Sequence, residues 1–384
     1  MTSPIKVGFV GLSKQGWASI LLAPTLLKNE KYSLTAVSTS SPESSKASAE
    51  KQSEAIGHPV TPYYGSTSKI AADPKVDFVA VSVTSPIHHD TLTPVLDVGK
   101  DFFIEWPAGR NTKETSEFAE KARAKGLRSM VGLQWRHSAV VKKVKEIIES
   151  GKIGKILSTS LVCMPAEDAV KCLLIIIQVG LVPRELEYWG PRTNKANAAT
   201  TSDPTAGSSM LDIVIGHHLD VLTYIFGDLS SLSATAETLY PTAEVVDTEG
   251  HVLETIANTS ADHIAFTGTF KSGVLVSESW RGGITTTQGR QQLLWEIDGE
   301  EGSIRLTDDQ MSAAFVHSRD LKLYLNGELV EVASIGLMGN LAAAWAEFAK
   351  GKEGTHATID DAVKIHQVID AITLSAKEGR RVVL

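Results

Sequence analysis

The residues best placed to do chemistry stand near the start of the chain, in a turn that contains two glycines. The turn Gly11-Leu12-Ser13-Lys14-Gln15-Gly16 follows a short apolar run and precedes a helix-compatible run. Strand, glycine turn and helix in this order open a dinucleotide-binding βαβ unit, in which backbone amides hold a pyrophosphate. We expect Gly11 to supply the tight turn and Gly16 a close contact between helix and strand. Ser13 replaces the middle glycine of the usual fingerprint, so a plain loop is the alternative.

The end of the next predicted strand, residues 32–39, bears on which dinucleotide is accepted. It lies about 20 residues after the glycine turn, where NAD sites place a carboxylate for the ribose 2′-hydroxyl. Here Ser38 and Thr39 end the strand, no acidic residue occurs before Glu43, and Lys46 follows. Hydroxyl groups and a nearby cation tolerate a 2′-phosphate, so we expect NADP rather than NAD. A serine-rich loop that contacts nothing is the alternative.

Three further apolar runs, within residues 75–83, 101–107 and 127–137, carry polar residues at their ends. Strand and helix patterns alternate through this half, which predicts a doubly wound parallel sheet. Because ligands bind at the carboxyl ends of such strands, the polar residues there are candidate cofactor contacts. These candidates are Thr84, His89, Glu105, Trp106, Gln134 and Arg136. Between the last two strands, Thr112 is expected to cap a helix.

A second set of candidates lies in the run MLDIVIGHHLDVLTYIFGD, residues 210–228. Its apolar spacing predicts a helix with one buried face, and His217 and His218 stand near the helix start. An imidazole can exchange a proton near pH 7 because its ordinary pKa is about 6.5. From these residues alone, two histidines that only form local hydrogen bonds are the favoured interpretation.

From about residue 151 the pattern changes to successive strands separated by turn residues such as Asn326-Gly327. This predicts an open, largely antiparallel sheet. Residues 183–209 have little periodicity and read as a long loop beside the site, with a surface insertion as the alternative. Two amphipathic helices close the chain, and the second pairs Thr358 with Asp361 at its start and carries His366, expected on its surface.

The composition bounds the class of protein. A chain of 384 residues, 42% hydrophobic and 21% charged, predicts a soluble protein with two domains, here 1–133 and 134–384. The net charge of −8 argues against nucleic-acid binding and gives no reason to expect a membrane surface. The two cysteines fit neither a metal site nor a disulfide framework. The apolar run 173–182 is too short to span a bilayer. The first strand begins so early that we expect no signal peptide. We therefore expect a cytoplasmic protein without a metal.

Several motifs in chain order resemble the Gfo/Idh/MocA family of NAD(P)-dependent oxidoreductases. They are VSVTSPIHH, GKDFFIEWPAG, VGLQWRHS and ESGKIGKI. Trp106, the run Leu133-Gln134-Trp135-Arg136 and the run Trp280-Arg281-Gly282-Gly283 are similar to a narrower branch that includes a fungal transcriptional regulator. The resemblance implies a Rossmann domain followed by an α+β substrate and oligomerisation domain, with C-terminal helices that pack back on the first domain.

The resemblance also implies roles for individual residues. The pyrophosphate would lie near Ser13 to Gly16, and Leu12, Gln15 and Trp17 are further candidate cofactor contacts. Thr84 and His89 would border the middle of the cofactor, and Glu105 and Trp106 would lie near the nicotinamide ribose. An Asp-x-x-x-His pattern in the family implies that His217 lies beside the reacting hydroxyl and that Asp212 is the nearby acid, although Asp212 stands five residues before His217 instead of four. Trp106, Arg136 and Arg281 are candidate substrate contacts, and ordinary ion pairs are the alternative for the two arginines.

The implied function is hydride transfer between NAD(P) and a secondary alcohol or carbonyl of a sugar-like or polyol-like molecule. Trp106 stands where the family usually has a lysine, and an indole has one N–H and no charge. A non-catalytic, NAD(P)-binding transcriptional regulator is therefore the alternative, and cofactor-assisted cleavage of a glycoside is a third hypothesis. The expected partners are a small-molecule substrate and a second copy of the chain, in a homodimer or a larger homo-oligomer.

Overall fold

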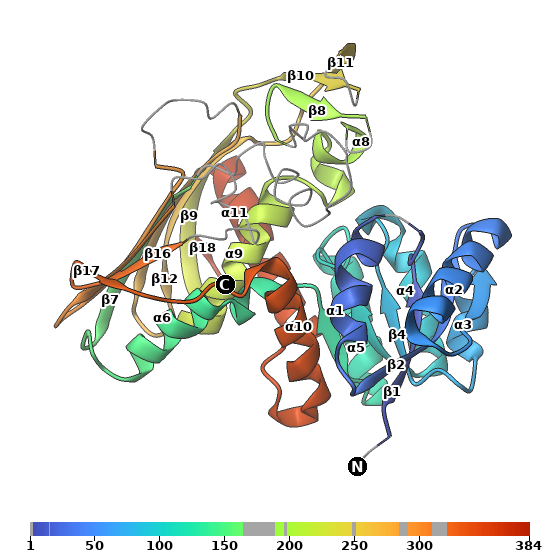
Figure 1. Ribbon diagram of the computed structural model, residues 1–384. Coiled ribbons are helices and arrows are strands. Elements are labelled where there is room, and N and C mark those ends of the chain that lie inside the picture. The colour runs from blue at the N-terminus through green and yellow to red at the C-terminus, as the bar shows by residue number, and fades with distance from the viewer. Residues whose placement is uncertain are drawn as a thin grey trace. The chain divides into compact units, whose positions relative to one another are not determined.

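The computed structural model describes residues 3–14, 16–163, 189–195, 198–247, 251–283, 291–308 and 321–384. The chain forms two compact units (Figure 1). The first unit consists of Met1–His137 and Met338–Val363, and the second consists of Ser138–Leu337 and Lys364–Leu384. The apolar run 173–182 and Cys172 lie outside the described residues.

The first unit is built on a six-stranded parallel sheet of order β3-β2-β1-β4-β5-β6. Its central strands are buried on both faces, as their nearly continuous apolar runs predict. The strand order reverses between β1 and β4, which is the place where doubly wound sheets bind dinucleotides. The strands are β1 Ile5–Val10, β2 Tyr32–Thr39, β3 Thr61–Tyr64, β4 Phe78–Val81, β5 Asp101–Ile104 and β6 Ser129–Val131.

The helices between these strands are α1 Ala23–Leu27, α2 Pro42–Ile56, α3 Ser68–Ala72, α4 His88–Val98 and α5 Thr112–Lys125. A π-helical turn, Ala18–Leu22, leads into α1, and 3-10 turns at Ser85–Ile87 and Gln134–His137 follow β4 and β6. The cap of α5 is Asn111, whose side chain accepts from Glu114 N at 3.0 Å, and the expected cap at Thr112 is wrong by one residue. The extended backbone that a cap requires is at Asn111, whereas Thr112 is already helical.

Helix α10, Gly336–Ala349, places Trp345 in the core of the first unit. The indole ring lies 4.8 Å from the Phe103 ring and 5.9 Å from the Tyr32 ring, centroid to centroid. Its Nε1 donates to Thr25 Oγ1 at 3.3 Å, so α10 lies beside α1 (Figure 1). Residues far apart in the sequence thus complete one hydrophobic core.

The second unit is built on a nine-stranded sheet of order β17-β16-β15-β14-β7-β13-β12-β9-β18. Only β7 and β13 pair in parallel, which confirms a mainly antiparallel sheet. Its strands are β7 Ile156–Cys163, β9 Leu229–Glu237, β12 His263–Phe270, β13 Leu275–Arg281, β14 Leu293–Gly299, β15 Ser303–Asp308, β16 Lys322–Leu325, β17 Glu328–Val330 and β18 Val382–Val383. Along β13, Val276, Glu278 and Trp280 are buried while Leu275 and Ser277 are exposed, so the sheet has one covered face.

The helices of the second unit are α6 Ala139–Glu149, α8 Ala198–Thr201, α9 Gly216–Phe226 and most of α11 Ile359–Glu378. A three-stranded sheet, β11-β10-β8, joins Val252–Ala257, Thr242–Val246 and Arg192–Asn194. The described part of the expected loop 183–209 therefore contains a strand and a helix, because β8 finds a parallel partner in β10, distant in sequence.

His366 on α11 is 1% exposed, so the expectation of a surface histidine is wrong. It follows Ile365, and both side chains are buried because the covered stripe of α11 is wider than its apolar residues indicate. Within the described ranges, no helix combines the length and the apolar character that a bilayer crossing needs.

Candidate active site

The glycine turn after β1 is held by backbone hydrogen bonds from Gly11 N to Ser38 O, 2.9 Å, and from Ser13 N to Gly11 O, 3.0 Å. Gly11 has a φ of 88°, and a Cβ there would lie 1.9 Å from Ser82 O. Both the backbone conformation and the close approach therefore require glycine. Gly16 has a φ of 106°, but no heavy atom lies within 4 Å of its Cβ position. The close contact expected at Gly16 is thus wrong: it occurs at Gly11, and Gly16 leaves open space at the helix start.

Trp17 connects this turn to the end of β5. Its Nε1 donates to Glu105 Oε1 at 2.7 Å. Burial raises the pKa of Glu105 to about 7, although hydrogen bonds from Trp17 and the Trp106 backbone oppose the rise. The side chain of Trp106 is buried, as is that of Leu12. Gln15 lies outside the described residues.

The end of β2 buries both of its candidate side chains. Thr39 Oγ1 donates to Ser41 O at 3.2 Å, and Ser41 Oγ accepts from Ser44 N at 3.2 Å as the cap of α2. Ser38 is 1% exposed, and its Oγ has no hydrogen-bond partner among the residues that the structure describes. Lys46 is exposed on α2. A buried hydroxyl thus lies at the strand end where a ribose substituent is expected.

The two histidines after β4 have different surroundings. The ring nitrogens of buried His88 lie 2.9 Å from Pro107 O and 3.0 Å from Val83 O, which ties the end of β4 to the segment after β5. Burial lowers the pKa of His88, although these hydrogen bonds oppose the change. His89, the predicted residue, has its Nε2 3.3 Å from Glu117 Oε2 on α5. His88, which the prediction missed, therefore contacts the segments that follow β4 and β5. The predicted residue, His89, contacts a side chain of α5 instead.

Gln134 and Arg136 stand in the turn after β6, and both are buried. No described residue forms a hydrogen bond with Gln134 Oε1. Arg136 Nη1 donates to Thr355 O at 3.4 Å and lies 3.8 Å from Asp361 Oδ2. These contacts match the ion-pair alternative for Arg136. Thr84, at the end of β4, is exposed.

The residues at this sheet edge fit a nicotinamide dinucleotide. The open space at Gly16 lies at a helix start, where backbone amides favour a pyrophosphate. Buried polar atoms are nearly always hydrogen-bonded. Ser38 Oγ and Gln134 Oε1 have no hydrogen-bond partner among the described residues, so a bound cofactor would supply one to each. Ribose hydroxyls and a carboxamide are donors of the required kind.

In the second unit, a π-helical turn, Leu211–Ile215, precedes α9. Asp212 lies in this turn, and His217 is the second residue of α9. Ser209, which the prediction missed, donates through Oγ to Asp212 Oδ2 at 2.6 Å. Burial raises the pKa of Asp212 to about 6, against the effect of the Ser209 hydrogen bonds.

His218 lies in the core and anchors α9 to the sheet. Its Nε2 lies 2.8 Å from Glu278 Oε1, and both side chains are fully buried. The His218 ring lies 5.3 Å from the Trp280 ring and 5.1 Å from the Trp295 ring. Its neighbour His217 is 7% exposed. The structure thus separates the adjacent histidines into an anchor and a candidate for chemistry.

The run Trp280-Arg281-Gly282-Gly283 ends β13 at a crossing of two chain segments. Gly282 N donates to Asp262 O at 2.6 Å, and Gly283 N donates to Trp189 O at 3.0 Å. A Cβ at Gly282 would lie 2.3 Å from Trp189 O, so this crossing requires glycine. Arg281 is partly exposed and forms no ion pair within the described ranges.

Comparisons with known proteins agree with this architecture. Residues 5–133 match the model of the Gfo/Idh/MocA oxidoreductase family with an NAD-binding Rossmann fold, and residues 139–308 match that of the Gal80p C-terminal domain. The chain is 31% identical to the dehydrogenase aclE of Aspergillus oryzae, over 99% of this chain and 98% of that protein. It is 27% identical to the galactose/lactose metabolism regulatory protein GAL80 of Saccharomyces cerevisiae, over 85% of this chain and 71% of that protein.

A solved structure extends the likeness to the whole fold. The crystal structure of a super-repressor mutant of Gal80p from Saccharomyces cerevisiae superposes with a TM-score of 0.84 at 21% identity, over 99% of this chain and 97% of that chain. The parallel sheet with its glycine turn, the mainly antiparallel sheet and the whole-length relative all point to one assignment. The chain belongs to the Gfo/Idh/MocA oxidoreductase family, with a second unit of the Gal80p C-terminal type.

Proposed function

We propose that this protein is an NAD(P)-dependent oxidoreductase that transfers a hydride between the nicotinamide and a secondary alcohol or carbonyl of a sugar-like or polyol-like molecule. The observation that carries the proposal is buried Asp212 in a π-helical turn, which accepts from Ser209 Oγ at 2.6 Å and has a pKa raised to about 6, with His217 five residues later in α9. Such turns are frequent at functional sites. The similarity to a dehydrogenase over the whole chain supports the proposal.

The first unit would hold the cofactor, which supplies the hydride donor or acceptor when it is bound. Backbone amides between Ser13 and Gly16 would hold the pyrophosphate, and Ser38 and Gln134 would each gain the hydrogen-bond partner that they lack among the described residues. The end of β2 carries no carboxylate that would repel a 2′-phosphate. We therefore favour NADP over NAD.

The second unit would supply proton transfer. His217 would accept the proton of the substrate hydroxyl, a contribution of about 10² to 10⁴ in rate. Asp212, with a pKa of about 6, would orient His217 and respond to pH near neutrality. Arg281 would hold a substrate oxygen, and Trp106 would form an apolar wall in place of the family's lysine.

A second candidate function is that of a non-catalytic, cofactor-binding transcriptional regulator. Its support is specific: Trp106 cannot provide the positive charge of a lysine, and the chain is similar to GAL80, a regulatory protein. Under this hypothesis the first unit binds NAD(P) while His217 has no role in turnover.

One experiment separates these functions. The purified full-length protein is titrated with NADPH and NADH by tryptophan fluorescence, and is then assayed with each cofactor against a panel of sugars and polyols. Binding with turnover supports the oxidoreductase, and binding without turnover on any compound supports the regulator. A protein that binds neither cofactor overturns both.

We also propose that the protein forms a homodimer in the cytoplasm through the uncovered face of the nine-stranded sheet. Val162 and Leu275 are 51% and 57% exposed there, on strands β7 and β13, which pair directly. A Val162→Lys variant should shift the mass seen by light scattering from dimer to monomer while the melting temperature stays unchanged. A wild-type protein that is monomeric at micromolar concentration contradicts this part of the proposal.

A further inference from the structure

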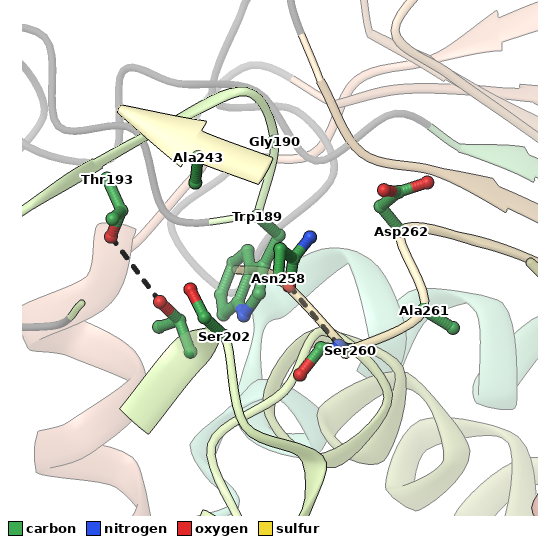
Figure 2. Close-up of a pocket in the computed structure, with 10 residues that line it drawn as sticks. Trp189, Gly190, Thr193, Ser202, Ala243, Asn258, Ser260, Ala261 and Asp262 are labelled. Carbon is green, nitrogen blue, oxygen red and sulfur yellow. Dashed lines mark hydrogen bonds between the residues drawn. The ribbon is translucent and has the colours of Figure 1, made fainter. Parts of the chain in front are cut away.

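The small polar pocket of the second unit, shown in Figure 2, has room for about one water molecule. Water is the natural partner of the buried Ser260 hydroxyl in its lining, so the pocket needs no other ligand. In the first unit, by contrast, polar side chains of α2 contact the backbone of the glycine turn itself. This helix lies outside the turn that defines the dinucleotide fingerprint.

Two side chains of α2 hold carbonyl groups of the glycine turn. Ser48, which is fully buried, donates through Oγ to Leu12 O. Lys51, about one helical turn later, donates through Nζ to Lys14 O at 3.0 Å. Because α2 follows β2 and the glycine turn follows β1, these bonds join two neighbouring βα units at the edge where a cofactor is expected.

The ammonium group of Lys51 also contacts the helical segment that follows the turn. Its Nζ donates to Ser19 Oγ at 3.1 Å, and Ser19 Oγ donates to Lys14 O at 3.1 Å. Lys14 O therefore accepts from two side chains and is held toward α2. A carbonyl oxygen carries a partial negative charge that repels a pyrophosphate, and the ammonium group offsets this charge.

The charge of Lys51 is not consumed by an ion pair. Both acceptors of its Nζ are neutral oxygens, and among the residues that the structure describes no carboxylate lies at ion-pair distance from it. Lys51 is exposed on α2, so salt in the solvent screens its charge. The ammonium is thus fixed against the turn by hydrogen bonds while its positive charge remains available to a bound anion.

We propose that Lys51 is a positioning residue of the dinucleotide site, which fixes the Lys14 carbonyl toward α2 and adds positive charge beside the pyrophosphate. The inference rests on the proposed cofactor site between Ser13 and Gly16, and it adds a residue that the glycine fingerprint does not contain. The pyrophosphate is common to NAD and NADP, so Lys51 acts equally on both. It therefore contributes affinity and does not discriminate between the two cofactors.

The test is a titration of the full-length protein with NADPH and with NADH, followed by tryptophan fluorescence at low and at high salt. Lys51→Met removes the charge and keeps an unbranched side chain, so we expect about tenfold weaker binding of both cofactors at low salt. The difference from wild type should shrink at about 1 M salt, where charges are screened beyond about 3 Å. Lys51→Arg keeps the charge and should restore most of the affinity.

Two further variants serve as controls. Ser48→Ala removes a neutral hydrogen bond between α2 and the same turn, so its binding should keep the salt dependence of wild type. Lys121→Met changes the net charge by the same amount as Lys51→Met, on an exposed lysine of α5 that pairs with Asp97. We expect this variant to bind both cofactors like wild type at each salt concentration.

Equal affinities in wild type and Lys51→Met would overturn the proposal. A loss that high salt leaves unchanged also overturns it, because the ammonium would then act only as a structural bond. A loss confined to NADPH would place the ammonium at the 2′-phosphate and has the same consequence. Since binding alone is measured, absence of turnover does not affect this test, whereas a wild-type protein that binds neither cofactor contradicts the proposed function itself.

Discussion

The indole Nε1 of Trp17 donates a 2.7 Å hydrogen bond to Glu105 Oε1. Trp17 follows the glycine turn after β1, Glu105 follows β5, and β4 lies between these strands in the sheet. The bond therefore spans the place where the strand order reverses and fixes the turn against the far strand end. Its acceptor has a pKa of about 7, so its charge changes near neutrality.

Replacement of Trp17 by Phe keeps the aromatic ring and removes the donor. We expect the free energy of unfolding to fall by about 1 to 2 kcal/mol, because a hydrogen bond to a carboxylate is lost. The affinity for the preferred dinucleotide should fall as well, since the turn loses its tether. Urea denaturation and cofactor titration measure the two effects. Trp189→Phe, in the second unit, is the control and should leave cofactor affinity unchanged; equal affinities in all three proteins contradict the prediction.

The Glu105→Gln variant tests the raised pKa. Because the folded pKa of about 7 lies above the usual 4.5, the folded protein keeps a proton that the unfolded chain releases between these values. The stability that this group contributes is complete below about pH 4.5 and is lost as the pH rises through 7. At about 1.4 kcal/mol per pKa unit the loss is at most about 3 to 4 kcal/mol, and less where solvent reaches the side chain. Denaturation at several pH values should show a steeper fall in wild type than in Glu105→Gln, in which Asp212 still contributes a slope of the same sign, and identical slopes refute the prediction.

The two glycines of the turn should respond differently to alanine. Gly11→Ala would place Cβ 1.9 Å from Ser82 O, so we expect a loss of several kcal/mol in the free energy of unfolding. At Gly16 the space is open and only the positive φ is unfavourable, so Gly16→Ala should cost about 1 to 2 kcal/mol. Thermal or urea denaturation checks the order. A larger loss at Gly16 than at Gly11 would show that the turn is wrongly described.

The adjacent histidines form a matched pair. His218→Asn removes the imidazole from buried Glu278, whose Oε2 still accepts from Trp280 Nε1 at 2.8 Å, so we expect a loss of about 1 to 3 kcal/mol in stability. His217→Asn should leave stability within about 1 kcal/mol of wild type and lower kcat about 10² to 10⁴-fold, with cofactor affinity unchanged. Denaturation, turnover and cofactor titration on both variants separate the roles. Full turnover in His217→Asn removes this residue from the mechanism.

Replacement of Arg136 and of Arg281 by alanine should have different effects on stability and on KM. Arg136→Ala removes contacts to Thr355 O and Asp361 within the first unit, so stability should fall by about 1 kcal/mol or more. Arg281→Ala should leave stability unchanged and raise KM for the substrate, because its guanidinium pairs with no carboxylate in the described ranges. Steady-state kinetics with denaturation curves decides between them. A KM effect at Arg136 alone would reverse the assignment.

Local features of the fold were predictable because they depend on neighbouring residues. The strand expected at residues 32–39 forms β2, and Asn326 and Gly327, with φ of 52° and 86°, turn the hairpin between β16 and β17. Thr358 and Asp361 exchange hydrogen bonds of 2.8 and 3.2 Å at the start of α11, as their spacing indicates. Each of these depends on a backbone conformation or a short-range bond.

Features that depend on distant partners were not predictable. The strand β8 was expected to be loop because its partner β10 lies some fifty residues later in the chain. His366 is buried although its neighbours in sequence indicate a helix surface. The segment Met338–Val363 joins the first unit through Trp345, whose ring partners are more than two hundred residues away.

The sequence by itself determined the two sheets, the glycine turn and the set of residues able to do chemistry, because spacing and backbone preference are properties of the local chain. Only the tertiary structure decided which of two adjacent histidines lies beside Glu278, since side chains of consecutive helical residues point about 100° apart and the packing selects one direction. It also decided that Asp212 stands in a π-helical turn before α9, where burial raises its pKa to about 6. The tertiary structure also decided that Arg136 lies near Asp361 and that Glu105 accepts from Trp17. These residues are far apart in the sequence and meet only when the sheet has formed.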